Sequence, residues 1–264
     1  MIADVEAAQA IIDRATPGTL QVVGVLTDEQ IVALEGIDFP QPTHLPWLDG
    51  RESKEARVES AMRSMFAGGL LEFKDTDDPD AKKLEAVSDV TGILTARRAT
   101  PYLLIGERET SQGRRWSYCY LFGGTVLEEQ ITDDGFHTFV VLSLTDLGDH
   151  LARFLDPVDR VDSAQFSAFQ RDFASAEAFA SEAGQIPEVA DTLASTTVTA
   201  MDAESQRAFV AAVFATSEGV YALTPKTWEI TDGEVSLCAL APEAIATVPN
   251  NLVAALGERG DAKS

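Results

Sequence analysis

Residues 115–142 of this 264-residue chain read RWSYCYLFGGTVLEEQITDDGFHTFVVL. Three runs rich in apolar and aromatic residues are separated by Gly123-Gly124 and by Thr132-Asp133-Asp134-Gly135. Such runs, bounded by glycine and aspartate, are typical of β-strands joined by tight turns. Turns this short cannot hold the crossover that parallel strands need. The stretch therefore predicts an antiparallel meander.

The strand pattern continues upstream of this stretch, and a helix is expected downstream. We predict strands over Ile93–Arg97 and Tyr102–Glu107, the second joined to the meander through the loop 109–113. After the meander, Thr145 is expected to cap a helix that ends at Asp156-Pro157.

Two more helical regions are expected further along. The first covers Ser163–Ala183, where Phe166, Phe169 and Phe173 would form one apolar stripe of core residues. The second begins at Pro187 and runs towards Leu193, because proline is favoured at the first helical position.

The first 78 residues are predicted to be mainly helical. Helical spacing of apolar residues predicts helices over Asp4–Ala15 and Glu52–Ala67, on either side of a proline-rich connection. Thr27 and Gln30 have the spacing of a capping box that opens a short third helix. Pro79, in the acidic run Asp75–Asp80, predicts a further helix that reaches about Val87.

The chain also shows signs of an internal duplication. The turn signal Ile131–Gly135 recurs as Ile230–Gly233, and each copy is followed by an apolar strand and a helix. The alternative is that two unrelated meanders share common turn chemistry. We expect a single domain over residues 1–264, with an N-terminal helical segment 1–78 and half-repeats at about 79–155 and 187–256. The predicted fold class is α+β: an antiparallel sheet from two pseudo-two-fold related halves, with helices flanking and covering one face.

Charge excludes several classes of function. Asp and Glu total 43 and Lys and Arg total 20, so the formal net charge is −23. A chain this acidic is a poor ligand for nucleic acid and is repelled by anionic membrane surfaces. No apolar run approaches a membrane span, and the first residues lack the features of a signal peptide. Cys119 and Cys238 are expected to be buried free thiols.

No pattern for catalysis, cofactor or metal binding is found. The three histidines, His44, His137 and His150, show no metal-ligand spacing and are expected at the surface. Acidic pairs such as Glu128-Glu129 are expected on a solvated face, because the chain is rich in them. We therefore expect no catalytic residues, no metal and no cofactor.

One cationic cluster is accompanied by an aromatic residue. Arg114-Arg115-Trp116 follows the loop 109–113, and arginine and tryptophan are enriched in protein-binding hot spots. An equally weighted alternative pairs these arginines across the strands with Glu107 and Glu109.

These features together resemble the EspG-type chaperones of actinobacterial type VII (ESX) secretion. A proline-rich stretch leads to a helix that ends in Met65–Leu71, which is similar to the family's L-x-x-x-G-L segment. The acidic start Asp78-Pro79-Asp80 and the duplicated sheet-and-helix halves also match the family pattern.

The resemblance implies a cytosolic, non-enzymatic chaperone, a monomer or weak homodimer, that keeps a helical PE/PPE-type secretion substrate soluble. In the family, the central sheet and the loop between its second and third strands contact the partner. That loop is short here. The residues assigned to partner binding by this position are Thr110, Ser111, Gln112, Gly113, Arg114, Arg115 and Trp116.

Two other functions remain open from the sequence. One is a regulator or adaptor whose sheet dimerises or binds a small ligand, with a pocket lined by Tyr118, Tyr120 and Trp228. The other is a carboxylate hydrolase, which would need two acidic residues converging in a cleft with perturbed pKa values.

Overall fold

The structure is a computed structural model of the whole chain. It describes residues 2–49, 51, 53–75, 82–157, 167–226 and 233–257. The fold is α+β, with a large antiparallel β-sheet flanked by helices, as the sequence predicted. Two compact units are distinguished: unit 1 comprises Met1–Thr100 and Thr125–Ser143, and unit 2 comprises Pro101–Gly124 and Leu144–Ser264.

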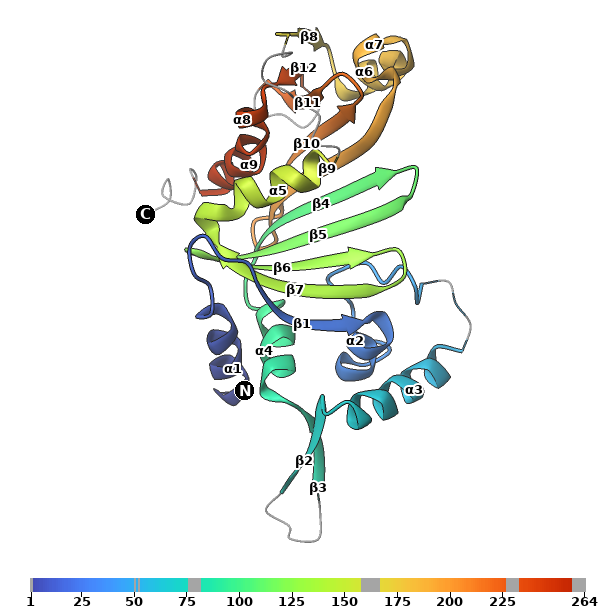
Figure 1. Cartoon of the computed structure of the whole chain (residues 1–264), viewed down its shortest axis with the longest axis vertical. Helices are drawn as coiled ribbons and strands as arrows, with labels where there is room; N and C mark the ends of the chain where they lie inside the picture. Colours follow the sequence, from blue (N-terminus) through green and yellow to red (C-terminus); the bar gives the residue numbers. More distant parts are fainter. Residues whose placement is uncertain are drawn as a thin grey trace. The chain divides into compact units, whose positions relative to one another are not determined.

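Unit 1 has three sheet strands in the order β1-β7-β6, together with a separate hairpin of β2 and β3 (Figure 1). Its described elements are α1 Ile2–Ile12, β1 Gln21–Thr27, α2 Asp28–Glu35, α3 Lys54–Ala67, β2 Leu71–Asp75, β3 Lys82–Ala86, α4 Ser88–Ala96, β6 Thr125–Thr132 and β7 Phe136–Ser143.

Unit 2 has seven strands in the order β5-β4-β9-β10-β11-β12-β8 within the described residues. Its strands are β4 Tyr102–Thr110, β5 Gly113–Phe122, β8 Gln170–Phe173, β9 Thr192–Asp202, β10 Arg207–Thr216, β11 Val220–Pro225 and β12 Val235–Leu240. Its helices are α5 Leu147–Leu155, α6 Ala176–Glu182, α7 Pro187–Ala190, α8 Pro242–Ile245 and α9 Thr247–Gly257, with short 3-10 turns at Leu144–Asp146 and Ala183–Gln185.

The start of α2 follows directly from local sequence. The Thr27 hydroxyl accepts a hydrogen bond from the backbone N–H of Gln30, and the Gln30 side chain accepts one from the N–H of Thr27. This is the predicted capping box, and it satisfies two backbone donors that a helix start leaves open. The helix stops at Gly36, whose φ of 105° is accessible to glycine.

Helices lie on both faces of the unit 2 strands. On one face, α5 and α9 lie across β4, β9 and β10 (Figure 1), and the Phe154 ring sits directly over Gly106 of β4. On the other face, α6 packs on β10 through Phe179 and Phe214, whose ring centroids are 5.6 Å apart. The part of β10 around Phe214 is therefore covered from two sides, whereas Val210 on the α6 side of the same strand is exposed.

In unit 1, α1 and α4 approach closely at Gly92. A Cβ atom at this position would lie 2.4 Å from the Ala7 carbonyl oxygen, which belongs to the backbone and cannot rotate away. We therefore expect Gly92→Ala to lower the free energy of unfolding by about 1–3 kcal/mol. Urea unfolding would measure this. Gly184→Ala is the control, because its Cβ would meet open space and should change stability by less than about 0.5 kcal/mol.

Two secondary-structure predictions around residue 90 are wrong. The helix expected to reach Val87 is strand β3, which pairs antiparallel with β2; residues 76–81 lie outside the described residues. The strand expected over Ile93–Arg97 belongs to α4. Its β-branched residues favour a strand locally, but the contact with α1 through Gly92 stabilises a helix instead.

Two predictions near the second half of the chain also need correction. The helical region expected over Ser163–Ala183 contains strand β8 and only then helix α6. Phe173 lies on β8 beside Val235 of β12, and Phe166 lies outside the described residues. Thr145 does not cap α5, which instead begins at Leu147 after a 3-10 turn.

The internal duplication stays a prediction. The chain order of four strands and a helix, β4 to β7 then α5, recurs as β9 to β12 followed by α8 and α9. Most of the second turn signal, Ile230 to Asp232, lies outside the described residues.

Candidate functional site

The predicted partner-binding residues lie at the tip of the β4–β5 hairpin. Their assignment to the loop between the second and third strands is wrong, because the strand expected over Ile93–Arg97 is part of α4 and strands β1 to β3 precede β4. Thr110 ends β4 and Gly113 begins β5, so Ser111 and Gln112 alone form the turn. The Thr110 hydroxyl accepts a hydrogen bond from the Gln112 N–H and donates one to the Gly113 carbonyl oxygen. This local bonding fixes a compact and exposed turn.

The residues that follow the turn differ in exposure. Arg114 and Arg115 are exposed, whereas Trp116 is buried. Arg114 lies opposite Glu109 and forms an ion pair of 3.4 Å with it, as the cross-strand alternative predicted. Arg115 lies opposite Arg108. The hairpin tip thus presents cationic side chains in a strongly acidic chain, while Trp116 supports the strand from the interior.

A buried polar cluster of unit 1 was not predicted. His137 of β7 is fully buried between two buried carboxylates (its Nδ1 is 2.6 Å from Glu129 Oε1 and its Nε2 is 2.7 Å from Asp28 Oδ1). The other oxygen of Asp28 accepts hydrogen bonds from the backbone N–H groups of Trp47 and Leu48, at 2.8 and 2.9 Å. The cluster therefore joins β6, β7, α2 and the proline-rich connection.

A buried arginine extends this cluster. Arg97 Nε donates to Glu129 Oε2 at 2.8 Å, and its two terminal nitrogens donate to Thr43 and Glu35. Both the Arg97 and the Glu129 side chains have no exposed surface. Arg98, at the end of the same helix, pairs with Glu35 at the rim of the cluster. We call Asp28, Glu35, Thr43, Arg97, Glu129 and His137 the buried ionic cluster.

The geometry favours the imidazolium form of His137. A neutral imidazole carries one N–H, so one of the two carboxylates would face a lone pair at hydrogen-bond distance. An imidazolium donates to both. Burial by itself would lower the pKa of His137, but the hydrogen bonds to Asp28 and Glu129 outweigh burial and raise it above its ordinary value.

The buried ionic cluster does not have the features of a catalytic site. Asp28 and Glu129 converge on a histidine, but all three residues are buried away from solvent. Substrate cannot reach them, and the hydrolase hypothesis required acidic residues in an open cleft. What the cluster can do is tie together segments that are far apart in the chain.

The predictions of a surface His137 and a solvated Glu128-Glu129 pair are wrong, because all three residues are buried. A sequence signal was present. Glu129 shares a strand face with Leu127 and Ile131, which are both buried. Period-two alternation therefore places this carboxylate on the core side. Its partners could not be identified from spacing, because they lie 8 to 86 residues away.

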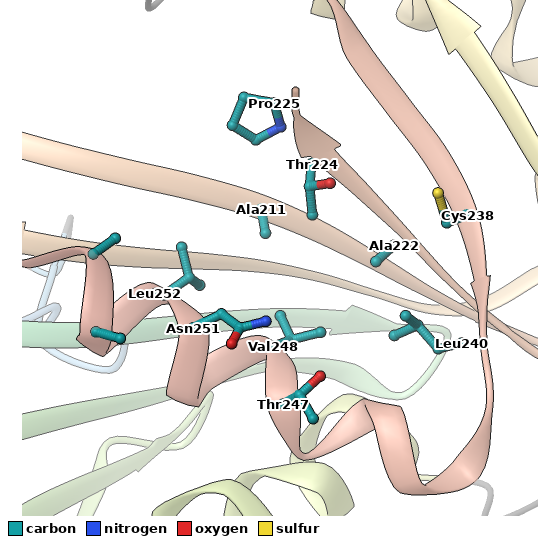
Figure 2. A pocket seen from close by; sticks show the side chains of 12 residues that line it. Ala211, Ala222, Thr224, Pro225, Cys238, Leu240, Thr247, Val248, Asn251 and Leu252 are labelled. Atoms are coloured by element: carbon teal, nitrogen blue, oxygen red, sulfur yellow. The ribbon is translucent and has the colours of Figure 1, made fainter. Parts of the chain in front are cut away.

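A cavity of about 410 Å³ lies between α9 and strands β10–β12 of unit 2. Figure 2 shows Ala211, Ala222 and Thr224 on the strands facing α9, which presents Val248 and Leu252. No charged side chain lines it among the described residues, so its chemistry suits a neutral group with both polar and apolar parts.

The cavity beside α9 does not contain the residues that were predicted to line a small-ligand pocket. Tyr118 and Tyr120 are both buried on β5, and Trp228 lies outside the described residues. Cys119 and Cys238 are free thiols, as predicted, with Cys119 buried and Cys238 half-buried.

Neither a metal site nor a membrane-spanning helix is found in the described ranges. No group of histidine, cysteine and acidic side chains in these ranges is arranged to hold a metal ion. Of the helices described, none combines the length and the apolar character needed to span a bilayer.

Comparison with known proteins gives a result at the level of structure alone. No protein-family profile matches the chain, and no curated protein matches it in sequence. Among solved structures, the chain is similar to the Mycobacterium tuberculosis type VII secretion system chaperone EspG5, solved in complex with the PE25-PPE41 dimer. The TM-score is 0.56 at 12% sequence identity, and the match covers 89% of this chain and 96% of the other. The two proteins thus share an EspG-like fold.

Proposed function

We propose that this protein is a non-enzymatic, cytosolic chaperone that binds a helical secretion substrate of the PE/PPE type and keeps it soluble for export. The observation that carries the proposal is the similarity to EspG5, which extends over nearly the full length of both chains. The solved chaperone is bound to a PE-PPE dimer, so the shared fold supports a helical protein as the partner.

The hairpin tip at residues 110–115 is the surface we propose for this partner. Ser111, Gln112, Arg114 and Arg115 are exposed there and project from a rigid pair of strands. Arg115 lies opposite Arg108, and this like-charge neighbour favours an external acidic or carbonyl acceptor. Trp116 is buried, so its role would be to support the hairpin and not to contact the partner directly.

Shielding of a helical partner has a clear physical basis. Helical proteins that assemble only after export carry exposed apolar surface, which promotes aggregation. A chaperone that covers this surface keeps the partner soluble, while its own net charge of −23 opposes self-association of the complex. Such a role requires no cofactor or metal.

The first experiment is capture of the tagged full-length chain from its native host, followed by mass spectrometry. We expect one helix-rich protein in stoichiometric amount. Coexpression of that protein with the chain should keep it soluble, and expression without the chain should not. Failure to find any partner, at low and at high salt, would contradict the proposed function.

Charge reversal at the hairpin tests the proposed surface. We expect Arg115→Glu to weaken binding of the captured partner about tenfold or more, measured by calorimetry with purified proteins. Arg63→Glu on α3 is the matched control, because this side chain is 78% exposed and the change of charge is the same. If both variants bind equally well, the hairpin is not the contact surface, although the chaperone function would stand.

A further inference from the structure

A cavity remains where helix α9 of unit 2 covers the sheet, although α5 packs tightly on the same face. Gly106 of β4 and Ala211 of β10 both lie opposite Val198 of β9, so they share one face of the sheet. At Gly106 the Phe154 ring of α5 comes within 2.8 Å of where a Cβ atom would lie. Beneath α9 a space of about 410 Å³ is left. Voids larger than a water molecule are rare in protein cores, whereas small-molecule sites measure roughly 300–1000 Å³. The cavity therefore has the size of a ligand site.

Small side chains on both walls explain this volume. Ala211 and Ala222 are buried on the strands and face α9 (Figure 2). Helix α9 contributes Ala254 and Ala255 to the other wall. An alanine side chain ends at Cβ, so neither wall reaches across the space, while the buried Leu252 packs beside it. The residues at these positions thus create the cavity and give it an apolar floor.

Polar groups without protein partners line the same cavity. In the part of the chain that the structure describes, no hydrogen bond joins the Thr224 hydroxyl or the Asn251 side-chain amide to another residue. Thr247 donates its hydroxyl proton to the Ala244 carbonyl oxygen at 2.6 Å, so the Thr247 oxygen can still accept. An asparagine amide offers donors and an acceptor, and a hydroxyl offers both. The cavity therefore combines an apolar floor with hydrogen-bonding groups that a bound molecule can use.

We propose that this cavity binds a small neutral molecule with an apolar body and a hydrogen-bonding head, such as a carbonyl, amide or hydroxyl group. The body would lie on Ala211 and Ala222, and the head would meet Thr224 and Asn251. Neutrality follows from the lining, because no described residue of the cavity carries a charge that could compensate a buried ion. The net charge of −23 disfavours anions further.

This inference goes beyond the proposed chaperone function and is independent of it. The cavity and the hairpin tip at residues 110–115 have no residue in common. Loss of ligand binding would therefore leave the capture of a helical partner unaffected, and failure to find a partner would leave the cavity as a separate site.

Titration of the full-length chain with prodan tests the proposal. Prodan is a neutral naphthalene that carries a ketone, and its fluorescence shifts to shorter wavelength when it leaves water. We expect saturable one-to-one binding in the micromolar range, which is ordinary for a molecule of this size. Anilinonaphthalene sulfonate, an anionic naphthalene, should bind about tenfold more weakly or worse. Equal affinity for the two probes would overturn the neutral class, and no saturable binding of prodan would overturn the site.

Substitutions that fill the cavity locate the bound probe. Ala211→Leu on the floor and Ala254→Leu on α9 should each weaken prodan binding about tenfold or more, because leucine occupies the space. Ala254 is exposed, so its replacement decides the matter if Ala211→Leu fails to fold. Ala208→Leu is the matched control: Ala208 is exposed on the opposite face of β10 and should bind prodan as the wild type does. Binding that both filling variants leave unchanged would overturn the proposal.

Replacement of Asn251 tests the position of the head. Asn251→Ala should weaken prodan binding about fivefold, the effect of one lost neutral hydrogen bond. Asn250→Ala is the control, because Asn250 is the next residue of α9 but lies against Gly148 of α5 and does not line the cavity. If the two variants bind prodan equally well, the head does not contact Asn251 and this assignment is overturned.

Discussion

Replacement of Arg97 by methionine is expected to lower the free energy of unfolding by about 3–5 kcal/mol. The Arg97 side chain is fully buried and donates to Glu129 and Glu35. Methionine preserves much of the volume but removes the positive charge. The Glu129 carboxylate then loses a charged donor while it stays buried, and this uncompensated charge is the source of the large effect.

Arg98→Met is the matched control for this prediction. Arg98 follows Arg97 directly and also pairs with Glu35, but its side chain is 32% exposed. Its removal should cost about 1 kcal/mol or less, because solvent screens such a pair. Urea unfolding followed by circular dichroism would compare the two variants. The comparison requires that the free energy of unfolding depends on urea concentration with the same slope in both. If both variants lose the same free energy of unfolding, burial of the cluster does not determine how much the cluster stabilises the protein.

The second large effect is on the pH dependence of the free energy of unfolding. The pKa of His137 is raised in the folded chain, because the two flanking carboxylates outweigh the effect of burial. The imidazolium therefore stabilises the folded state fully below the unfolded pKa of about 6.5. This contribution is lost as the pH rises through the folded pKa. One proton is involved, so the slope between the two pKa values is about 1.4 kcal/mol per pH unit.

His137→Gln isolates the contribution of the imidazolium to the free energy of unfolding, measured by urea unfolding from pH 6 to alkaline pH. The variant should be less stable at pH 6 and should lack the alkaline slope that the wild type shows. His44→Gln is the control, because it makes the same substitution at an exposed histidine. The interpretation fails if wild type and His137→Gln lose stability in parallel as the pH rises.

Local sequence determined some elements and not others. The capping box at Thr27 and the turn at Thr132–Gly135 were predicted because the hydrogen bonds that define them, between Thr27 and Gln30 and from the Gly135 N–H to the Thr132 carbonyl, join residues close in sequence. Helix α4 was missed because Val90, Thr91 and Ile93 favour a strand locally, and only the contact with α1 overrides that preference.

The buried ionic cluster shows a second limit of sequence reasoning. Burial of Glu129 could have been deduced from its apolar neighbours at two-residue spacing. Its partnership with Arg97 and His137 could not, because long-range pairing leaves no periodic signal. The hairpin tip was located correctly because two strands and a short turn are a local motif. Whether a given side chain is exposed there, as for Trp116, depends on packing from elsewhere.

The discontinuity of unit 1 affects how the chain can fold during synthesis. Residues 1–100 emerge from the ribosome first, but β6 and β7, which complete this unit, follow only after β4 and β5 of unit 2. Until residue 129 has emerged, Arg97 has no Glu129 to bind, and until residue 137 has emerged, Asp28 has no His137. Residues 1–100 therefore cannot complete the core of unit 1 when they emerge. Unit 1 is complete only after strands β4 and β5 of unit 2 have been synthesised.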